Sequence, residues 1–264
     1  MSVGVITGSG TYTLPGFEAA APERFATRFG ETLVTRGSIG EVEILHLSRH
    51  GEGHKRLSNH VNHKANVTTL KELGAECVLA VTVCGAVDPS VPLGSLIVFD
   101  DLHFGVNRLA DGSLCTLYDT PGDPLRGHWI YESPFSADVR AAMLAGCRDA
   151  GLPVRDGGCY GHVDGPRFNT RAEIRSLALA GVTAVSQTAG PETVLCGEAE
   201  LAYALLGYAT DYANGVKEQP TSVAELARLI AASTPAFASV LSAALPKLAR
   251  HEAAPPGVLY RFGD

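Results

Sequence analysis

The segment spanning residues 62–83 constrains the fold more than any other part of this sequence. Residues 62–73 have the spacing of an amphipathic helix, and Gly74 directly after them is a residue type that commonly ends helices. Residues 77–83 (CVLAVTV) are continuously apolar and rich in β-branched side chains, which is typical of a strand covered on both faces. A helix that leads at once into a buried strand indicates an α/β protein.

The rest of the chain continues this alternation of strands and helices. Residues 202–210 fit either element by periodicity, and we assign a strand because Asp211 and Gly215 soon follow. Residues 221–245 carry one apolar stripe and a capping Ser222, which predicts an amphipathic helix. The other predicted elements are strands at 3–7, 42–47, 96–98 and 182–185 and helices at 137–150, 171–180 and 192–199.

Length and composition agree with one large domain. The chain has 264 residues, of which 45% are hydrophobic and 19% charged, so it can bury a sizeable core. We therefore expect a single α/β domain over residues 1–250, with a central mixed β-sheet flanked by helices. Residues 251–264 contain paired prolines and are expected to form a C-terminal tail.

Charge and cysteine content narrow the classes of function. A net charge of −7 and only 7% aromatic residues count against a nucleic-acid binder, which usually has a basic face and stacking side chains. Polar residues interrupt the long apolar stretches and the N-terminus lacks a basic signal region, so we expect a cytoplasmic protein without a membrane span. The six cysteines form no Cys-x-x-Cys pair and are expected to be reduced.

Ligands of α/β proteins bind at the carboxyl ends of strands, so the residues after each predicted strand are candidates for a site. The first strand is followed by Gly8-Ser9-Gly10, where glycines let the backbone approach an anion and Ser9 adds a hydroxyl donor. This turn matches neither the dinucleotide fingerprint nor a P-loop. The alternative is an ordinary turn without a ligand.

Arg49 and His50 follow the strand predicted at 42–47. Arginine offers a planar fork for a phosphate group, and the histidine adds a donor. One alternative is an exposed arginine beside a hydrogen-bonded histidine. Another is a metal site, but the neighbouring histidines straddle a strand end and Glu52 is the one acid among them, so we predict no metal. Those histidines are His46, His54, His60 and His63.

Three further positions have side chains suited to binding or catalysis. Thr82 ends a buried strand, where a hydroxyl suits an anion or a sugar. Phe168 lies in a Gly-Pro turn before a helix that Thr170 can cap, and a phenylalanine held there can stack on a flat heterocycle, the alternative being the core. Asp211 ends an apolar strand, where burial raises the pKa of a carboxyl group and lets it donate a proton, the alternative being a turn cap. Cys84 lies in apolar surroundings and is expected to be inert.

Taken in order, these motifs resemble the trimeric purine nucleoside phosphorylase family. The series is Gly-Ser-Gly, Arg-His-Gly, Thr-x-Cys-Gly, Gly-Pro-Arg-Phe, Thr-x-x-Pro-Glu and Ala-Thr-Asp-Tyr, and residues 165–173 (GPRFNTRAE) are its most specific part. The resemblance covers residues 3–245 and is greatest to the branch that acts on 5′-methylthioadenosine. It implies a homotrimer that converts a purine nucleoside and phosphate to free base and sugar 1-phosphate. Phosphate is then a co-substrate, and no metal or organic cofactor is used.

The resemblance also implies a role for each matching residue. The residues matched to phosphate binding are Ser9, Arg49, His50, Thr82, Val83 and Thr188. Asp211 matches the acid that faces the purine, and with Arg49 and His50 it forms the catalytic set. The residues matched to the nucleoside are Phe168, Asn169, Gln187, Asp211, His128, Val223, Leu226 and Ala227, with Phe168 on the base, His128 reaching across the trimer interface and the last three near the sugar 5′ end.

Three residues depart from the family pattern and leave the substrate open. Ala213 replaces a second aspartate of the adenine branch, Asn169 matches neither branch, and Gln187 replaces a methionine beside the sugar. Because the Asp211 carboxylate can accept a hydrogen bond from a 6-amino group, we expect 5′-methylthioadenosine or a related 5′-deoxy-adenine nucleoside. The alternatives are another purine nucleoside (adenosine, a deoxy or halogenated analogue, or a 6-oxopurine nucleoside such as inosine) and a binding protein without catalysis.

Overall fold

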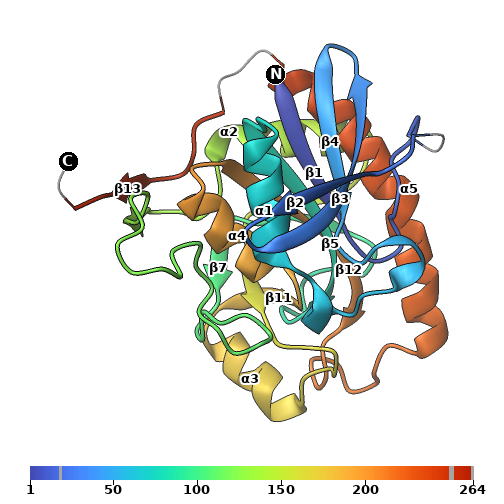
Figure 1. Ribbon diagram of the computed structural model, residues 1–264. Helices are drawn as coiled ribbons and strands as arrows, with labels where there is room; N and C mark the ends of the chain where they lie inside the picture. The colour runs from blue at the N-terminus through green and yellow to red at the C-terminus, as the bar shows by residue number, and fades with distance from the viewer. Residues whose placement is uncertain (18–19, 250–252, 263–264) are drawn as a thin grey trace.

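The computed structural model describes residues 1–17, 20–249 and 253–262. An 11-stranded mixed sheet forms its centre, and helices lie on both sides of that sheet (Figure 1). The prediction of an α/β domain with a central mixed sheet is therefore confirmed. The boundary expected between residues 250 and 251 lies outside the described residues.

Four parallel strands form the middle of the sheet. β1 (Ser2–Thr7) lies between β4 (Val42–Ser48) and β5 (Cys77–Ala86), and β5 also pairs with β12 (Ala202–Tyr212). β12 is thus a strand, as predicted. Because all four run in the same direction, their carboxyl ends meet at one edge of the sheet.

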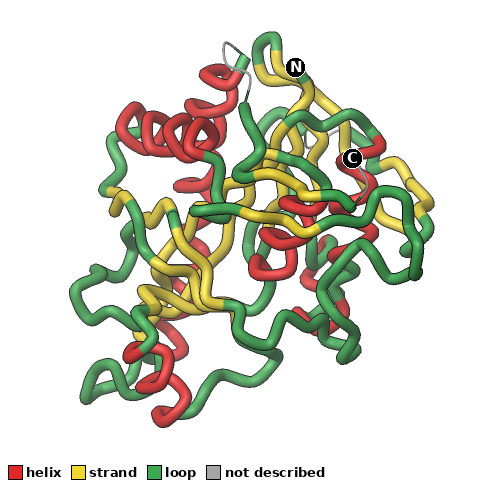
Figure 2. The backbone as a smooth tube through the Cα atoms, turned by 90° about the vertical axis from the view of Figure 1, so that its left-hand side faces the viewer, coloured by secondary structure: helices red, strands yellow, loops and turns green. Residues whose placement is uncertain are grey.

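The sheet extends outward from β5 and β12. The end of β5 pairs antiparallel with β11 (Val182–Ser186). From β11 the sheet continues through β10 (Cys159–His162) to β7 (Asp101–His103). From β12 it continues through β6 (Leu96–Val98) to β9 (Val154–Asp156). β11 therefore ends beside the end of β5, at the edge where the parallel strands finish. Figure 2 shows the twisted sheet running between the helices.

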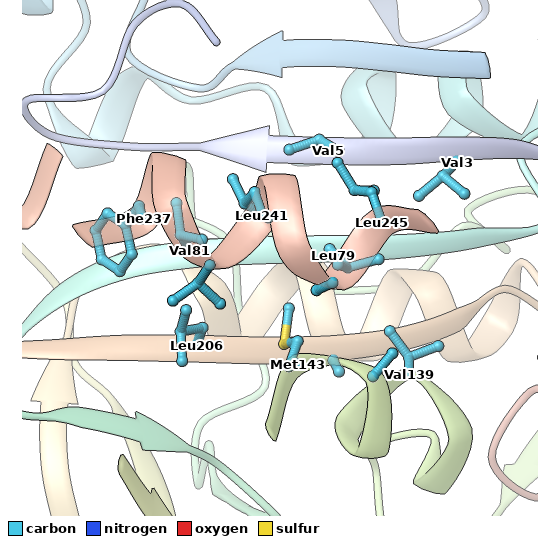
Figure 3. Close-up of a cluster of buried hydrophobic side chains, with 14 of the residues drawn as sticks. Val3, Val5, Leu79, Val81, Val139, Met143, Leu206, Phe237, Leu241 and Leu245 are labelled. Atoms are coloured by element: carbon cyan, nitrogen blue, oxygen red, sulfur yellow. The ribbon is translucent and has the colours of Figure 1, made fainter. Parts of the chain in front are cut away.

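Each face of the sheet has its own hydrophobic core. α2 (Ala137–Asp149) and α5 (Val223–Leu248) pack against β12 on one face, where Met143 and Leu241 are buried with strand residues such as Leu79 (Figure 3). α1 (His63–Glu72) and α4 (Ala189–Glu198) contact each other on the opposite face. Burial on both faces explains why the central strands are continuously apolar.

The capping signals in the sequence act as predicted. Thr170 caps α3 (Arg171–Leu179), accepting from the Glu173 amide at 3.3 Å, while the Glu173 carboxylate accepts from the Thr170 amide at 2.7 Å. Ser222 caps α5 by accepting from the Glu225 amide at 3.2 Å. These bonds satisfy amides that have no partner within the helix and so set where each helix begins.

α5 corrects one expectation from the sequence. It is long and apolar enough, by length and composition alone, to cross a membrane, whereas charged residues were expected to interrupt every such stretch. In the structure, Leu229, Phe237 and Leu245 pack into the core against the sheet. The apolar character of α5 is therefore explained by its packing on the domain.

Several strands were not predicted because they are polar, short or both. β2 (Glu23–Thr27) and β3 (Gly30–Ile39) form a hairpin whose side chains are mostly exposed or half-buried. β8 (His128–Ile130) pairs with β13 (Val258–Tyr260) in a separate two-stranded sheet. Part of the expected C-terminal tail is therefore a paired strand.

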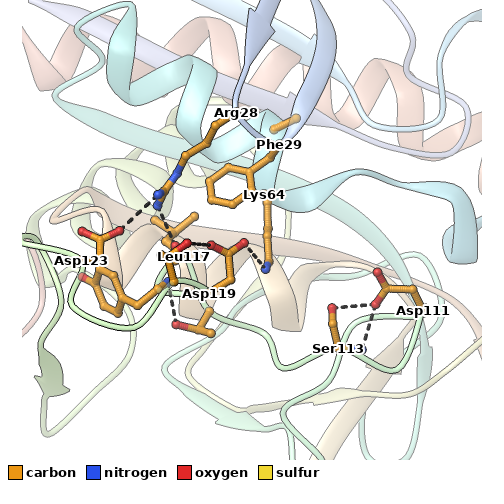
Figure 4. A network of polar contacts seen from close by, with 12 residues as sticks. Arg28, Phe29, Lys64, Asp111, Ser113, Leu117, Asp119 and Asp123 are labelled. Atoms are coloured by element: carbon orange, nitrogen blue, oxygen red, sulfur yellow. Dashed lines mark hydrogen bonds and ion pairs between the residues drawn. The ribbon is translucent and has the colours of Figure 1, made fainter.

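A polar network holds the long segment between β7 and β8 against the β2–β3 turn (Figure 4). Arg28 donates to the Asp123 carboxylate at 3.1 Å and to the Leu117 carbonyl at 2.7 Å. Lys64 of α1 lies 3.5 Å from the Asp119 carboxylate. These contacts hold residues 117–123 of this segment, which has little regular structure, against the rest of the domain.

The single tryptophan reports on the C-terminal strand. The Trp129 indole of β8 donates to the Pro256 carbonyl at 2.7 Å. A chain that ends at residue 254 loses this acceptor together with β13, so the emission of Trp129 should shift to longer wavelength while the far-ultraviolet circular dichroism stays close to that of the full chain. Unchanged emission would contradict this packing.

Candidate active site

A cavity of about 280 Å³ lies at the edge of the sheet where β1, β4, β5, β11 and β12 end. This is the position at which α/β folds usually bind ligands. The structure brings most of the predicted residues together there, from segments far apart in the sequence. Those that line the cavity are Ser9, Arg49, His50, Thr82, Val83, Phe168, Asn169, Gln187, Thr188, Asp211 and Leu226.

Arg49, one of the cavity residues, belongs to a buried ion pair. The side chains of Arg49 and Glu192 are both 0% exposed, and Arg49 donates from Nε and Nη2 to the two Glu192 carboxylate oxygens at 2.6 and 2.7 Å. Arg49 Nη1 donates to the Val81 carbonyl at 2.8 Å. Burial alone would lower the pKa of Arg49, but the charge and hydrogen bonds of Glu192 raise it. Three of the five N–H bonds of a charged guanidinium are therefore used within the protein, and two remain.

The Gly-Ser-Gly turn after β1 makes room for this guanidinium. A Cβ atom at Gly8 would lie 2.5 Å from Nη1 of Arg49, so a larger residue there would displace the arginine. Ser9 follows and lines the cavity on the same side. Gly8 is therefore needed both for the turn and for the observed position of the Arg49 side chain.

Hydroxyl groups approach the cavity from two other strands. Thr188 stands at the N-cap of α4, and its side chain makes no capping hydrogen bond. Thr82 Oγ1 lies 3.1 Å from the hydroxyl of Ser186 and donates to the Val83 carbonyl at 3.0 Å. Hydroxyls that face a cavity beside a charged arginine are suited to an oxyanion.

His50 faces the cavity in its neutral form. Burial, followed by the nearby charge of Arg49, lowers the pKa of His50 to about 4. Its Nδ1 lies 2.8 Å from the Arg56 carbonyl, which can only accept, so Nδ1 carries the hydrogen and Nε2 is an acceptor. The prediction that His50 offers a donor to phosphate is therefore wrong for the neutral ring, because the Arg56 carbonyl takes its N–H. The ring stacks on His54 with centroids 4.1 Å apart.

Asp211 is aimed into the cavity by an irregularity in β12. The pairing of β12 with β5 shifts between Ala209 and Asp211, so Thr210 is an extra residue, as in a β-bulge. The Asp211 carboxyl lies over Gly85, where a Cβ would be 3.0 Å from Oδ2. Burial raises the pKa of Asp211, although the Thr210 hydroxyl, 2.9 Å away, acts in the opposite direction. A carboxyl group with a raised pKa is suited to donating a proton.

Phe168 lies on the cavity wall and not in the core. Its side chain is 59% exposed in this structure, in the loop before α3. The backbone carbonyl of the next residue, Asn169, accepts from the Asn214 side chain at 2.7 Å. An exposed aromatic ring beside two amides and Asp211 suits a flat, polar heterocycle.

Three predicted nucleoside residues do not line this cavity. His128 lies on β8 and is exposed, with its ring edge-on to Phe262 at 5.4 Å. On α5, Leu226 faces the cavity, whereas Val223 is the first residue of the helix and is 83% exposed. Ala227 is also exposed because it is turned about 100° from Leu226. Within one chain, Leu226 therefore lines the cavity as expected for the apolar 5′ pocket, whereas Val223 and Ala227 do not.

Several residues in or next to the cavity were not predicted from the sequence. Glu192 was visible as part of a Pro-Glu motif, but nothing local indicated its pairing with Arg49. Asn214 and Ile230 lie near predicted residues on β12 and α5. Among the described residues, no group of three or more His, Cys, Asp or Glu is placed to hold a metal ion. All six cysteines are free thiols, and burial raises the pKa of Cys84.

Comparison with known proteins identifies the family. Residues 2–246 match the family model described as the phosphorylase superfamily. The chain belongs to this superfamily. The resemblance found in the sequence motifs is thereby confirmed, as is the prediction that the chain is an enzyme of this kind.

Relatives of two specificities are similar to this member of the superfamily. It is 31% identical over 249 residues to the 6-oxopurine nucleoside phosphorylase of Pyrococcus furiosus, covering 92% of each chain. It is 37% identical over 220 residues to the S-methyl-5′-thioadenosine phosphorylase of Mycolicibacterium smegmatis, covering 82% of this chain and 79% of the relative. A solved structure of methylthioadenosine phosphorylase from Schistosoma mansoni with adenine aligns with a TM-score of 0.83 at 26% identity, over 95% of this chain and 92% of that one.

The buried pair gives a stability prediction with an internal control. Glu192→Gln keeps the shape of the side chain but removes the charge that balances Arg49, so the free energy of unfolding should fall by about 3–5 kcal/mol. Glu225 and Arg228 make the same side-on bidentate pair at 2.7 and 2.8 Å on the surface of α5. Glu225→Gln should change stability little, because water screens that pair. Equal effects of the two substitutions in urea unfolding would contradict the argument.

Proposed function

We propose that this enzyme cleaves a purine nucleoside with inorganic phosphate, and that 5′-methylthioadenosine or a closely related 5′-deoxy-adenine nucleoside is its substrate. One observation carries the proposal. A charged guanidinium with unused N–H bonds and a buried carboxyl group with a raised pKa line the same cavity, beside an exposed aromatic ring. Phosphorolysis needs these groups together: an anion site, an acid and a platform for the base.

The phosphate would occupy the side of the cavity formed by Arg49, Ser9 and Thr188. The two free N–H bonds of Arg49 and the hydroxyls supply donors for its oxygens. Hydrogen phosphate also carries a hydroxyl, which can donate to the unprotonated Nε2 of His50. The N-terminus of α4, which follows Thr188, adds the positive end of a helix dipole. Thr82 and the backbone of Val83 border the adjacent sugar.

The chemistry balances with these groups. The bond between the anomeric carbon and purine N9 breaks, its electron pair goes to the purine, and a phosphate oxygen forms the new bond to the anomeric carbon. The sugar becomes cationic on the way, and a phosphate held beneath it stabilises that charge. Asp211 donates its proton to the leaving purine. The proton that hydrogen phosphate loses on forming the sugar ester then reprotonates Asp211, so no proton is gained or lost overall.

Asp211 favours an adenine base. While its O–H donates to the leaving purine, its other oxygen can accept a hydrogen bond from a 6-amino group, whereas a 6-oxo group presents only an acceptor. Phe168 would stack on the ring, with Asn169 at its edge. Leu226 and Ile230 on α5 offer an apolar wall for a 5′-methylthio group.

A 6-oxopurine nucleoside is the second candidate. Ala213 leaves Asp211 without a second acid, and the side-chain amides of Asn169 and Asn214 can donate to a 6-oxo group. The similarity to the enzyme of Pyrococcus furiosus points in the same direction.

We further propose that the active form is a homotrimer. His128 is exposed and outside the cavity of its own chain, so it can act at the sugar only across an interface, as the family resemblance implies. The reaction as written uses no metal or organic cofactor.

A substrate panel tests the function directly. Release of free base should require phosphate and should be fastest from 5′-methylthioadenosine, compared with adenosine, 2′-deoxyadenosine, a 5′-halogenated analogue and inosine. Good turnover of inosine without release of adenine would favour the second candidate. Phosphate binding without release of base from any nucleoside would indicate a binding protein.

Asp211 should carry the proton transfer. Asp211→Ala, and Asp211→Asn as the conservative variant, should lower turnover by about 10²–10⁴-fold, the usual contribution of a general acid. Because burial raises the pKa of Asp211, the protonated form persists to higher pH, and wild-type turnover should fall as the pH rises through that raised value. A loss below tenfold in both variants would show that Asp211 is not the donor.

A further inference from the structure

Gln187 joins two loops of the cavity. Its Oε1 accepts from the Ser58 hydroxyl at 3.0 Å, and its Nε2 donates to the Arg167 carbonyl at 3.2 Å. Ser58 begins the short 3₁₀ helix Ser58–His60 after β4, whereas Arg167 lies in the loop between β10 and α3. One side chain at the end of β11 thus connects segments that are 129 and 20 residues away from it.

The packing at Gly165 shows how closely these groups meet. A Cβ atom there would lie 2.0 Å from Oε1 of Gln187 and 2.3 Å from the Ser58 hydroxyl oxygen. Any side chain at position 165 would therefore push the two partners apart. The contact between Ser58 and Gln187 depends on a backbone without a side chain at this position.

The bridge that Gln187 forms between Ser58 and Arg167 lies next to the aromatic residue of the site. Phe168 follows Arg167 directly and is 59% exposed, so core packing does not hold it. Arg167 itself is fixed on its other side by Glu173, to which it donates at 2.7 and 2.9 Å. The loop that carries Phe168 is thus held by α3 at one point and by Gln187 at another.

We propose that Gln187 is a positioning residue that orders Phe168 and the Ser58 segment for a flat base, and is not a ligand that distinguishes the hydroxyl groups of the sugar. One N–H of its amide and one lone pair of its amide oxygen already serve protein groups on either side. An apolar side chain of similar length could fill the same space but could not tie the two loops. This inference rests on the proposed function for its kinetic consequences and on the structure alone for the order of the loops.

The test compares Gln187→Met, which removes both bonds, with Ser58→Ala, which removes one. Each should raise the KM for the nucleoside by about twofold to tenfold, the size expected for neutral hydrogen bonds. A less ordered loop weakens binding of the nucleoside equally in the ground state and in the transition state. kcat, the KM for phosphate and the preference between a ribonucleoside and its 2′-deoxy counterpart should stay close to wild type. The nucleoside KM of the double variant should be no higher than that of Gln187→Met, because both substitutions break the same bridge.

Amide hydrogen exchange of the free enzyme provides a readout that needs no substrate. Residues 163–169 should exchange faster in both variants than in wild type. Ser113→Ala is the matched control, because it removes a serine hydroxyl bond to Asp111 (2.6 Å) in a loop that does not line the cavity (Figure 4). It should change neither exchange in 163–169 nor the nucleoside KM. If Gln187→Met does not fold, Gly165→Ala takes its place, with the same expected changes.

Two results would overturn the proposal. One is a change of more than about tenfold in the ribose-to-deoxyribose preference in Gln187→Met with no effect of Ser58→Ala, which would make Gln187 a sugar ligand. The other is unchanged exchange of 163–169 in both variants. If the wild-type enzyme cleaves no purine nucleoside, the proposed function fails, and the exchange measurement still decides whether the bridge orders the loop.

Discussion

The site depends on the ion pair between Arg49 and Glu192. It joins the end of β4 to the first turn of α4, across 143 residues of sequence and entirely out of contact with water. Removing two charges from water is unfavourable unless each is well paired, so the pair holds both elements in one arrangement. Tyr203 adds a hydrogen bond to the Glu192 carboxylate at 3.2 Å. The result is an arginine that is charged and immobile, with two N–H bonds that these contacts leave unused.

The remaining parts of the site follow from the sheet. Parallel strands bring the residues after β1 and β4 and the last residues of β5 and β12 to one edge, and the antiparallel contact of β5 with β11 adds the residues that lead into α4. The extra residue in β12 then turns Asp211 into the cavity opposite the arginine. The anion side and the acid side of the cavity are thus fixed by backbone pairing, whereas Phe168 depends on a loop.

Local patterns were sufficient to predict the central strands, the main helices and most of the cavity. Apolar runs that end in glycine or hydroxyl residues identified β1, β5 and β11, and cap residues identified α3 and α5. The hairpin of β2 and β3 was missed because few of its residues are buried, and β13 was missed because its partner β8 is far away in sequence. Glu192 was missed for a related reason: pairing with Arg49 is a property of the folded chain and leaves no local pattern. Gln187 was noticed as an unusual residue beside the sugar, but only the structure shows which groups its amide contacts.

In the proposed reaction, phosphate lies against Arg49 and faces Asp211 across the anomeric carbon of a nucleoside. A crystal structure with inorganic phosphate and a non-cleavable nucleoside analogue would show both groups at once. Phosphate oxygens should lie within hydrogen-bond distance of Arg49, Ser9 and Thr188, and the purine should lie between Phe168 and Asp211. Phosphate absent from this corner, or a purine bound with its imidazole edge away from Asp211, would contradict this arrangement.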